Sequence, residues 1–225
     1  MPGRPRCPAC LRPRADCLCG LATPVAHRAE VLILQHPLEV HHAKGTARLV
    51  HLCLPRSRLE VGEAFDPEAL RAWLTAPWPG APAGAGPHAV LLYPPSPPDP
   101  ALPLAPVPPL PPQWLAGDAA CLRLVVLDGT WRKSRKMLYA NPLLQALPRL
   151  PLSPGLPASG YGSLRRAHAP HQLSTLEATC AALAQVEGGQ DERYAPVRAA
   201  FAAFMARQVA RQQGRVPPAA SPAGC

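Results

Sequence analysis

A short apolar run that ends abruptly on four functional residues is the feature that most constrains this chain. Residues 122–127 are rich in leucine and valine, and they lead directly into Asp128-Gly129-Thr130-Trp131. A short, β-branched apolar run predicts a buried strand of a parallel sheet. Ligands of open α/β sheets bind outside the carboxyl ends of such strands. The tetrapeptide is therefore expected where chemistry is done, and it carries a carboxylate, a hydroxyl and an indole.

Similar apolar runs alternate with helical patterns along the rest of the chain. Runs that predict further strands occur at 30–35, near 59–61, at 89–93 and near 150–152. Helical periodicity or capping residues predict helices at 43–54, from Asp66-Pro67 onward, at 132–144, at 174–186 and at 191–213. The alternation predicts an α/β fold with a mainly parallel sheet. Prolines crowd residues 94–112, which excludes a regular helix or an interior strand there.

Composition narrows the class of partner. The 225 residues are enough for one domain with a real core and a small appendage. Lysine and arginine outnumber aspartate and glutamate by 23 to 14, which favours a polyanionic partner such as nucleic acid. The N-terminus lacks the apolar stretch of a secretory signal, and no run approaches the roughly 18 apolar residues of a membrane span. We therefore expect a cytoplasmic protein with no membrane contact.

Four cysteines near the N-terminus have the spacing of a metal site, at Cys7, Cys10, Cys17 and Cys19. Four thiolates in a short stretch suit tetrahedral zinc, and a site filled by sulfur has no open position, so the metal would be structural. The alternative is a disordered arm of unligated thiols. Four arginines surround these cysteines: Arg4, Arg6, Arg12 and Arg14. They are expected either in a zinc knuckle that faces nucleic acid or in a basic arm exposed to solvent.

Several of the functional residues also have a purely structural interpretation. Asp128 could be a general base, an acceptor for a ligand, or the N-cap of the next helix. Trp131, at a helix start, is either core or a stacking platform. Ser174 and Glu177 have the spacing of a capping box, which explains both residues without a ligand. The functional alternative is that this loop-to-helix junction closes over a small ligand.

Cationic side chains gather on the helix after the tetrapeptide, at Arg132, Lys133, Arg135 and Lys136. Next to a candidate site they suit a phosphate clamp, although a run of charges is also typical of a solvated helix face. A second stripe of cationic residues near the C-terminus consists of Arg207, Arg211 and Arg215. It would either extend an RNA-binding surface or simply be exposed to solvent.

Four motifs in order resemble the DTW-domain proteins, which are tRNA-uridine aminocarboxypropyltransferases. These motifs are the N-terminal Cys-x-x-Cys and Cys-x-Cys pairs, the 128–131 tetrapeptide with its Arg-Lys-Met helix, the Tyr161-to-Arg166 loop, and Leu-Ser-Thr-x-Glu at 173–177. The resemblance runs from about Cys7 to Phe204. It departs locally at Gly45-Thr46, where an Asn-Thr pair is expected.

The resemblance implies a SPOUT-like fold with a C-terminal knot. It also implies that S-adenosylmethionine donates its 3-amino-3-carboxypropyl group to N3 of a tRNA uridine, giving 3-(3-amino-3-carboxypropyl)uridine. Two alternatives stay open, an S-adenosylmethionine-dependent RNA methyltransferase and a non-catalytic zinc-containing RNA-binding protein. We expect a zinc-binding arm over 1–25, the catalytic domain over 26–213 and a disordered tail over 214–225, in either a monomer or a homodimer.

The resemblance and the predicted strand ends also assign site residues. The catalytic residues are Asp128, Thr130 and Trp131, and Asp128 would accept or direct the proton of uridine N3. Burial beside Trp131 would raise the pKa of Asp128 from its ordinary value of about 3.9. The predicted cofactor-binding residues are Leu92, Tyr93, Pro94, Leu127, Gly129, Leu164, Arg165, Thr175 and Glu177. The predicted tRNA-binding residues are Arg132, Lys133, Arg135, Lys136 and Arg166.

Overall fold

Five parallel strands form one sheet in the order β2-β1-β4-β3-β5. The computed structural model describes residues 5–79, 87–94, 106–153 and 173–213. The strands are β1 (Glu30–Gln35), β2 (Ser57–Val61), β3 (His88–Leu92), β4 (Leu122–Asp128) and β5 (Arg149–Leu150). The predicted α/β fold with a parallel sheet is confirmed. The central strands β1 and β4 pair along their length, so that Glu30 lies opposite Arg123 and Gln35 opposite Asp128.

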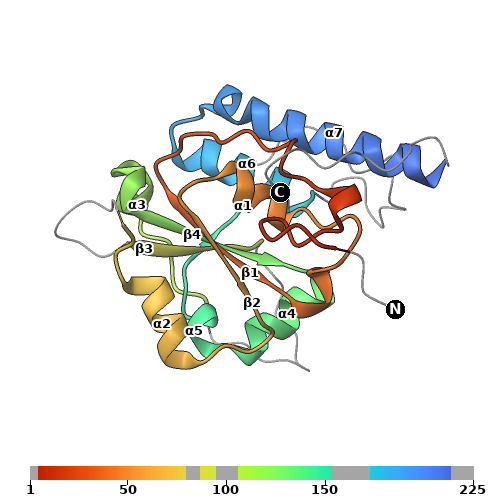
Figure 1. Cartoon of the computed structure of the whole chain (residues 1–225). Helices are drawn as coiled ribbons and strands as arrows, with labels where there is room; N and C mark the ends of the chain where they lie inside the picture. The colour runs from red at the N-terminus through yellow and green to blue at the C-terminus, as the bar shows by residue number, and fades with distance from the viewer. Residues whose placement is uncertain (1–4, 80–86, 95–105, 154–172, 214–225) are drawn as a thin grey trace.

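Helices cover both faces of this sheet (Figure 1). They are α1 (Ala47–Cys53), α2 (Pro67–Thr75), α3 (Pro112–Ala116), α4 (Trp131–Ala140), α5 (Pro142–Gln145), α6 (Thr175–Val186) and α7 (Ala195–Gln212). Because side chains alternate along a strand, β1 contributes to two cores. Val31 and Ile33 pack with α1, α6 and α7, whereas Leu32 and Leu34 pack with α2, α4 and α5. The result is three layers, with the sheet in the middle.

Helix boundaries follow local chemistry. The predicted start at Asp66-Pro67 is confirmed, because the Asp66 carboxylate accepts a hydrogen bond from the Ala69 amide at 2.9 Å. The helix predicted over 43–54 is shorter than expected, since α1 begins only at Ala47. The helix predicted over 132–144 is interrupted, because Asn141 precedes Pro142 and leaves the helical conformation (φ −128°). A separate short helix, α5, then begins at Pro142.

An ion pair explains how an arginine fits into the apolar β4. Arg123 and Glu30 are almost fully buried, and the Arg123 Nε donates to Glu30 Oε2 at 2.8 Å. Arg123 also donates to the carbonyl oxygens of Trp73 and Ala76, and its guanidinium lies 4.3 Å from the Trp78 ring centroid. The buried guanidinium therefore has a counter-charge, hydrogen-bond acceptors and an aromatic ring as partners, as burial of a charged group requires.

Some predicted segments lie outside the described residues. These are most of the proline-rich loop, the Tyr161-to-Arg166 motif and the expected tail, which fall within 95–105, 154–172 and 214–225. None of the helices in the described part of the chain is long and apolar enough to cross a membrane.

Candidate active site

The carboxyl ends of neighbouring strands bring the predicted site together. β4 ends at Asp128, β1 ends opposite it at Gln35, and β3 ends at Leu92, next to the buried Tyr93. The chain then returns at Thr175, the first residue of α6, which lies against Asp128. Residues from four parts of the sequence therefore meet at one edge of the sheet.

Two side chains hold the Asp128 carboxylate in place. Asp128 is 5% exposed, and its Oδ1 accepts a hydrogen bond from the Thr175 hydroxyl at 2.6 Å. Its Oδ2 accepts one from the Gln35 amide nitrogen at 2.9 Å. Donors from β1 and α6 thus fix the orientation of a carboxylate that β4 supplies.

Burial raises the pKa of Asp128. Loss of solvation is the main cause, and the nearby Glu39 carboxylate acts in the same direction. The hydrogen bonds from Thr175 and Gln35, and the proximity of His42, act in the opposite direction. The net shift makes Asp128 a better proton acceptor than an ordinary aspartate.

The structure rejects two structural interpretations of the tetrapeptide. Asp128 does not cap α4, because Thr130 occupies the N-cap position and its hydroxyl accepts a hydrogen bond from the Lys133 amide at 3.4 Å. Trp131 is not a core residue, since it is 51% exposed. Its ring meets the Tyr93 ring edge-on, with centroids 5.8 Å apart. Neither helix capping nor core packing therefore accounts for Asp128 and Trp131.

The junction at the start of α6 combines a cap with a contact to the site. The Ser174 hydroxyl accepts from the Glu177 amide at 3.2 Å, and the Glu177 carboxylate accepts from the Ser174 amide at 2.8 Å. The predicted capping box is thus confirmed. The adjacent Thr175 points to Asp128 instead, so capping does not account for the whole motif.

The predicted cofactor-binding residues fall into three groups. Leu92 ends β3 and is followed by Tyr93 and Pro94, while Leu127 and Gly129 flank the end of β4, so these five lie at adjacent strand ends. A side chain at 129 would be crowded, since an added Cβ would lie 3.1 Å from the Lys133 Cβ. Thr175 reaches the same edge, whereas Glu177 lies in the capping box. Leu164 and Arg165, together with the predicted tRNA-binding Arg166, lie outside the described residues.

The four cationic residues of α4 have different surroundings. Lys133 Nζ lies 2.7 Å from Glu39 Oε1, and Lys136 Nζ lies 2.8 Å from Glu63 Oε1. Glu63 also accepts from the His36 ring at 2.9 Å, and these contacts, that with Lys136 foremost, lower the pKa of Glu63. Arg132 and Arg135 are exposed.

The four N-terminal cysteines converge on one point. Their sulfur atoms all lie within 4.8 Å of one another, and three of the four side chains are buried. The Cys7 and Cys19 sulfurs are 3.6 Å apart, and those of Cys10 and Cys17 are 3.9 Å apart. Four thiolates around a tetrahedral zinc ion, with Zn–S of about 2.3 Å, would be separated by about 3.8 Å. The donor set and its spacing therefore fit a structural metal ion.

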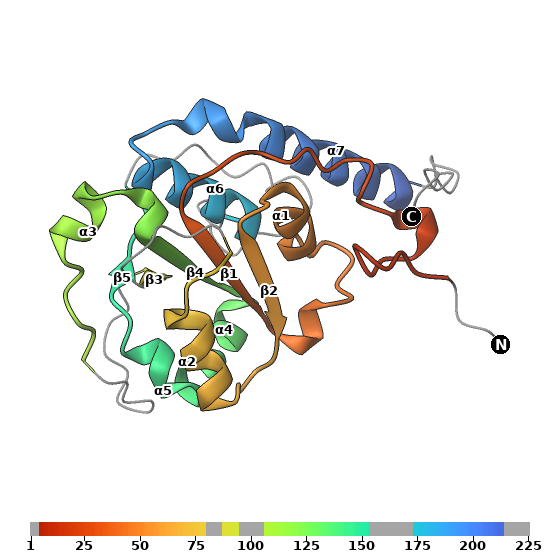
Figure 2. The ribbon, with the colours of Figure 1, turned by 60° about the vertical axis from the view of Figure 1, so that its left-hand side comes forward.

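The cysteine arm, residues 5–25, docks on the C-terminal helix α7. Figure 2 shows the arm running beside this helix. Arg207 donates to the Cys17 carbonyl oxygen, and Arg211 donates to the Ala15 carbonyl oxygen and pairs with Asp16. Arg207 and Arg211 of the predicted stripe therefore hold the arm on α7, and Arg215 lies outside the described residues.

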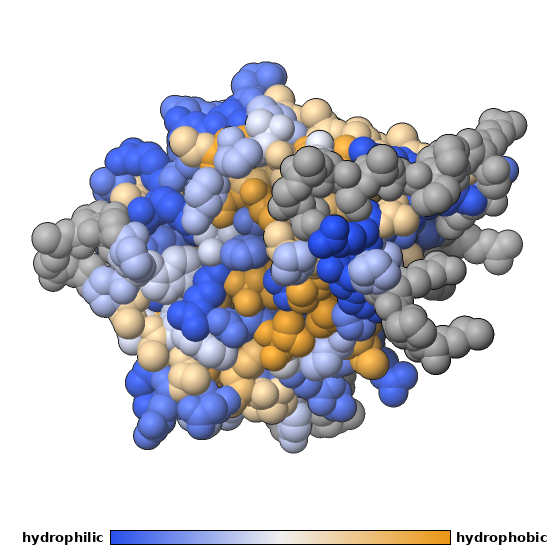
Figure 3. Space-filling view, viewed as in Figure 1, coloured by the Kyte–Doolittle hydropathy of each residue, from blue (hydrophilic) through white to orange (hydrophobic). Residues whose placement is uncertain are grey.

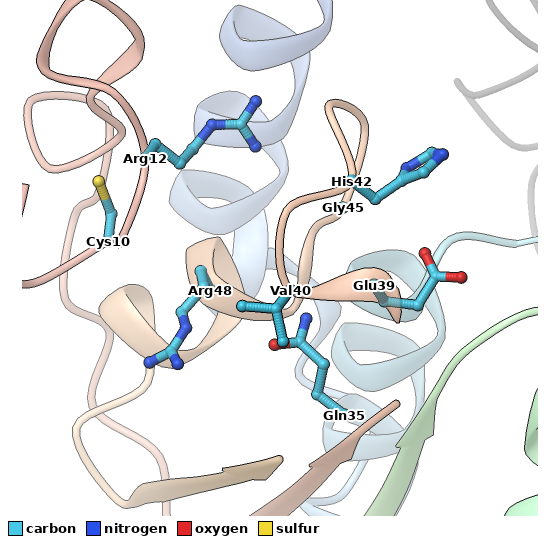
Figure 4. A pocket seen from close by; sticks show the side chains of 8 residues that line it. All are labelled: Cys10, Arg12, Gln35, Glu39, Val40, His42, Gly45 and Arg48. Carbon is cyan, nitrogen blue, oxygen red and sulfur yellow. The ribbon is translucent and has the colours of Figure 1, made fainter. Parts of the chain in front are cut away.

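A small hollow, partly open to solvent, separates the cysteine arm from the end of β1 (Figure 4). It is lined by Cys10, Arg12, Gln35, Glu39, Val40, His42, Gly45 and Arg48. The buried Oε1 of Gln35 has no hydrogen-bond partner among the described residues, nor have the Nε atoms of Arg12 and Arg48. The hollow therefore contains both an unused acceptor and unused donors.

Sequence reasoning missed three residues that shape this site: Gln35, Glu39 and Glu63. None belongs to a recognisable motif. A signal for Gln35 was nevertheless present, because a polar residue that ends one central parallel strand lies close to the polar end of its neighbour. Glu39 is 94 residues from Lys133, and no local pattern links the two.

Hydrophobic residues are also exposed on the surface. Figure 3 shows them in the middle of the face seen in Figure 1, bordered by hydrophilic residues. The large exposed hydrophobic side chains of the described chain include Leu38, Trp131 and Tyr139, the last being 52% exposed. Trp131 and Tyr139 both belong to α4.

The fold and the site define a parallel α/β domain with a buried carboxylate at the sheet edge and a cysteine cluster on its N-terminal arm. A family model described as DTW domain matches residues 4–209. The chain belongs to the DTW domain family, which confirms the resemblance seen in its motifs.

Curated relatives carry one kind of name. A Macaca fascicularis protein, "tRNA-uridine aminocarboxypropyltransferase 2", is 26% identical over 199 residues, covering 82% of this chain and 57% of the relative. A Drosophila melanogaster protein of the same name is 29% identical over 199 residues, covering 87% of this chain and 72% of the relative. An Arabidopsis thaliana protein, "tRNA-uridine aminocarboxypropyltransferase A", is 28% identical over 142 residues, covering 61% and 52%. The chain thus spans just over half the length of the first and third of these. No solved structure matches it.

Proposed function

We propose that this protein transfers the 3-amino-3-carboxypropyl group of S-adenosylmethionine to N3 of a uridine in tRNA. The observation that carries the proposal is the Asp128 carboxylate, buried and held by Thr175 and Gln35 beside the exposed Trp131. The names of the curated relatives support the same reaction.

The reaction is a displacement at carbon. A bond forms between uridine N3 and the γ-carbon of the methionine part, and the bond from that carbon to sulfur breaks. The electron pair of the broken bond neutralises the sulfonium, so the second product is 5′-methylthioadenosine. Methyl transfer from the same sulfonium is avoided if the site presents the γ-carbon in line with N3, which is catalysis by positioning.

Asp128 deals with the N3 proton in this proposal. The N3–H of uridine is a weak acid, and its proton must leave as the new bond forms. A carboxylate whose pKa is raised by burial accepts that proton more readily than an ordinary aspartate. Thr175 and Gln35 keep its lone pairs in a fixed direction, and Trp131 offers an aromatic surface next to it.

The cofactor site extends along the adjacent strand ends. Residues 92–94 and 127–129 provide its central part, and Thr175 brings the start of α6 to it. The C-terminal knot of a SPOUT-like fold is part of the proposal, and what supports it is the membership of the DTW domain family.

We assign RNA contact to one face of α4. Trp131, Arg135 and Tyr139 follow one another at intervals of four residues, so they share a helix face, and Arg132 adjoins them. All four are exposed. Aromatic rings stack on unpaired bases and arginines contact phosphates, which fits a target uridine in an unpaired region. Lys133 and Lys136 contribute less, because Glu39 and Glu63 already pair with them.

Zinc, bound by the four cysteines, completes the proposal as a structural ion. Cys7, Cys10, Cys17 and Cys19 would hold it, and the ion would fix an arm that has little core of its own. The proposal also divides the chain into three parts: a zinc-binding arm over 1–25, a catalytic domain over 26–213 and a tail over 214–225.

One incubation tests the reaction. Purified protein is mixed with S-adenosylmethionine and unmodified tRNA, and the nucleosides are then measured by mass. The expected product is 3-(3-amino-3-carboxypropyl)uridine together with 5′-methylthioadenosine. A methylated nucleoside would indicate a methyltransferase, and unchanged tRNA that still binds would indicate a non-catalytic RNA-binding protein. Either result would overturn the proposal.

A further inference from the structure

The hollow beside Gln35 contains an acceptor that the protein leaves unused. Gln35 is 1% exposed, its Oε1 has no partner, and its amide nitrogen is committed to Asp128. A buried polar atom without a hydrogen bond costs about 1–3 kcal/mol, so such atoms usually have a partner. The partner must donate a proton, which excludes the Cys10 sulfur once it is a metal-bound thiolate.

Unused donors lie on the wall of the same hollow. Arg48, on α1, has a buried Nε without a partner, and it has no hydrogen bond or ion pair among the described residues. Arg12 also has an unused Nε, but its guanidinium already contacts the Ala43 carbonyl oxygen at 2.7 Å and the Phe204 ring. Arg48 is therefore the principal cation available to a ligand.

Figure 4 shows how these groups are arranged. Gln35 rises from the end of β1 toward Val40, with Arg48 on one side and Glu39 on the other. The hollow thus has a cation at one side, a carboxylate at the other and an amide oxygen between them. A group with both a negative and a positive end, close together, matches this pattern.

We propose that the hollow binds the amino and carboxylate groups of S-adenosylmethionine, with the carboxylate on Arg48 and the ammonium on Gln35 Oε1. This inference rests on the proposed function, and it adds which end of the substrate lies where. Glu39, with one oxygen on Lys133, adds negative charge on the ammonium side. Because Gln35 also contacts Asp128, the γ-carbon of the same group would lie near the proposed proton acceptor.

An uncharged uracil edge is a weaker match. It would pair with Gln35 through N3–H, but it carries no charge to set against Arg48. The doubly charged end of an amino acid matches the charges on the two sides of the hollow.

The test compares three ligands by calorimetry on the full, metal-loaded protein. S-adenosylmethionine carries the ammonium, the carboxylate and the sulfonium, its decarboxylated form keeps the ammonium and the sulfonium, and 5′-methylthioadenosine has none of these charges. The wild type is expected to bind S-adenosylmethionine at least about tenfold more tightly than 5′-methylthioadenosine, since charged hydrogen bonds are gained. Equal affinities would overturn the inference without any variant.

Two variants then assign the groups. Arg48→Met is expected to weaken S-adenosylmethionine about tenfold or more and to leave the other two ligands within about twofold. Arg48→Lys should restore part of the loss. Gln35→Leu is expected to weaken both ligands that carry the ammonium and to spare 5′-methylthioadenosine. The control is Arg58→Met, because Arg58 lies on β2 and packs on Trp73 outside the hollow.

The outcomes separate this inference from the proposed function. The metal content of each variant is measured, because Cys10 also lines the hollow. If Arg48→Met retains its metal and binds all three ligands like the wild type, or weakens them equally, the inference is wrong even when tRNA is modified. If Arg48→Met loses its metal, the Gln35→Leu result decides. Absence of any S-adenosylmethionine binding by the wild type would instead overturn the proposed function.

Discussion

Gln35 and Asp128 lie opposite each other at the ends of the two central strands, and the Gln35 amide donates to the Asp128 carboxylate at 2.9 Å. The Gln35 oxygen remains unpaired. The amide can therefore reverse its orientation if residue 128 becomes a donor. The fold should therefore tolerate the replacement of Asp128 by asparagine.

Asp128→Asn should separate activity from stability. We expect transferase activity to fall by about 10²–10⁴-fold, because the proton acceptor is lost. The melting temperature should stay the same or rise, since the buried charge disappears and a reversed Gln35 can accept from the new amide. Nucleoside mass analysis and thermal unfolding measure the two effects. Asp191→Asn, at an exposed ion pair with Arg198, is the control and should keep its activity. A large loss of stability in Asp128→Asn would contradict this account.

Thr175→Val should move the pH dependence of the reaction. The Thr175 hydroxyl stabilises the charged form of Asp128, so its removal raises the pKa of Asp128 further. The acid limb of the pH–rate profile should then shift to higher pH. Thr179→Val is the matched control, because the Thr179 hydroxyl bonds to its own helix at the Thr175 carbonyl oxygen. An unchanged acid limb in Thr175→Val would mean that Asp128 does not set it.

His27 should make the fold sensitive to mild acid. Its Nδ1 donates to the Ala29 carbonyl oxygen and its Nε2 accepts from the Arg56 amide, so the ring is held neutral, and burial lowers its pKa. The unfolded chain therefore binds this proton first. Stability should fall as the pH drops below about 6.5, the ordinary histidine value. Denaturant unfolding of the wild type and His27→Gln at pH 7.5 and near pH 5 should show a smaller loss in the variant. His41→Gln, at an exposed site, should behave as the wild type does.

Glu30→Gln should be strongly destabilising. It would leave Arg123 buried without a counter-charge, which typically costs about 3–5 kcal/mol. The control is Glu60→Gln, because the Glu60–Arg58 pair is more exposed and should contribute under about 1 kcal/mol. Urea unfolding measures both, and similar values for the two variants would show that the buried pair is not a special feature.

Chelation of the metal should loosen the arm before the sheet. Residues 5–25 depend on the cysteine cluster and on contacts to α7, whereas β1 and β4 also pack with α2, α4 and α5 in a second core that contains no residue of the arm. We expect protease cleavage in the arm and faster amide exchange near Arg207 and Arg211. The amides of β4 should stay protected. Loss of protection in β4 at the same chelator concentration would show that the arm is needed for the whole fold.

β1, β3 and β4 were predictable because each is a short apolar run that ends at a polar residue or just before a proline. β1 has the predicted bounds, and β4 differs only by including Asp128. The sequence could not show which residue caps α4, since Asp128 and Thr130 are both good caps and only the fold decides between them. The prediction of one continuous helix over 132–144 was wrong, because Pro142 separates α4 from α5.

The site was only half predictable for a different reason. Asp128, Trp131 and Thr175 belong to motifs, so they could be found in the sequence. Gln35, Glu39 and Glu63 act through pairings that exist only after β1 and β4 lie side by side. Pairs so distant in sequence leave no periodic signal along the chain.

The docking of the arm on α7 also has a consequence for the order of synthesis. Arg207 and Arg211 follow the arm residues they hold by 190 and 196 positions. At ordinary translation rates, the arm is synthesised on the order of ten seconds or more before Arg207 and Arg211. The cysteine cluster thus leaves the ribosome well before the helix that holds its arm in place. During that interval its thiols have no support from α7.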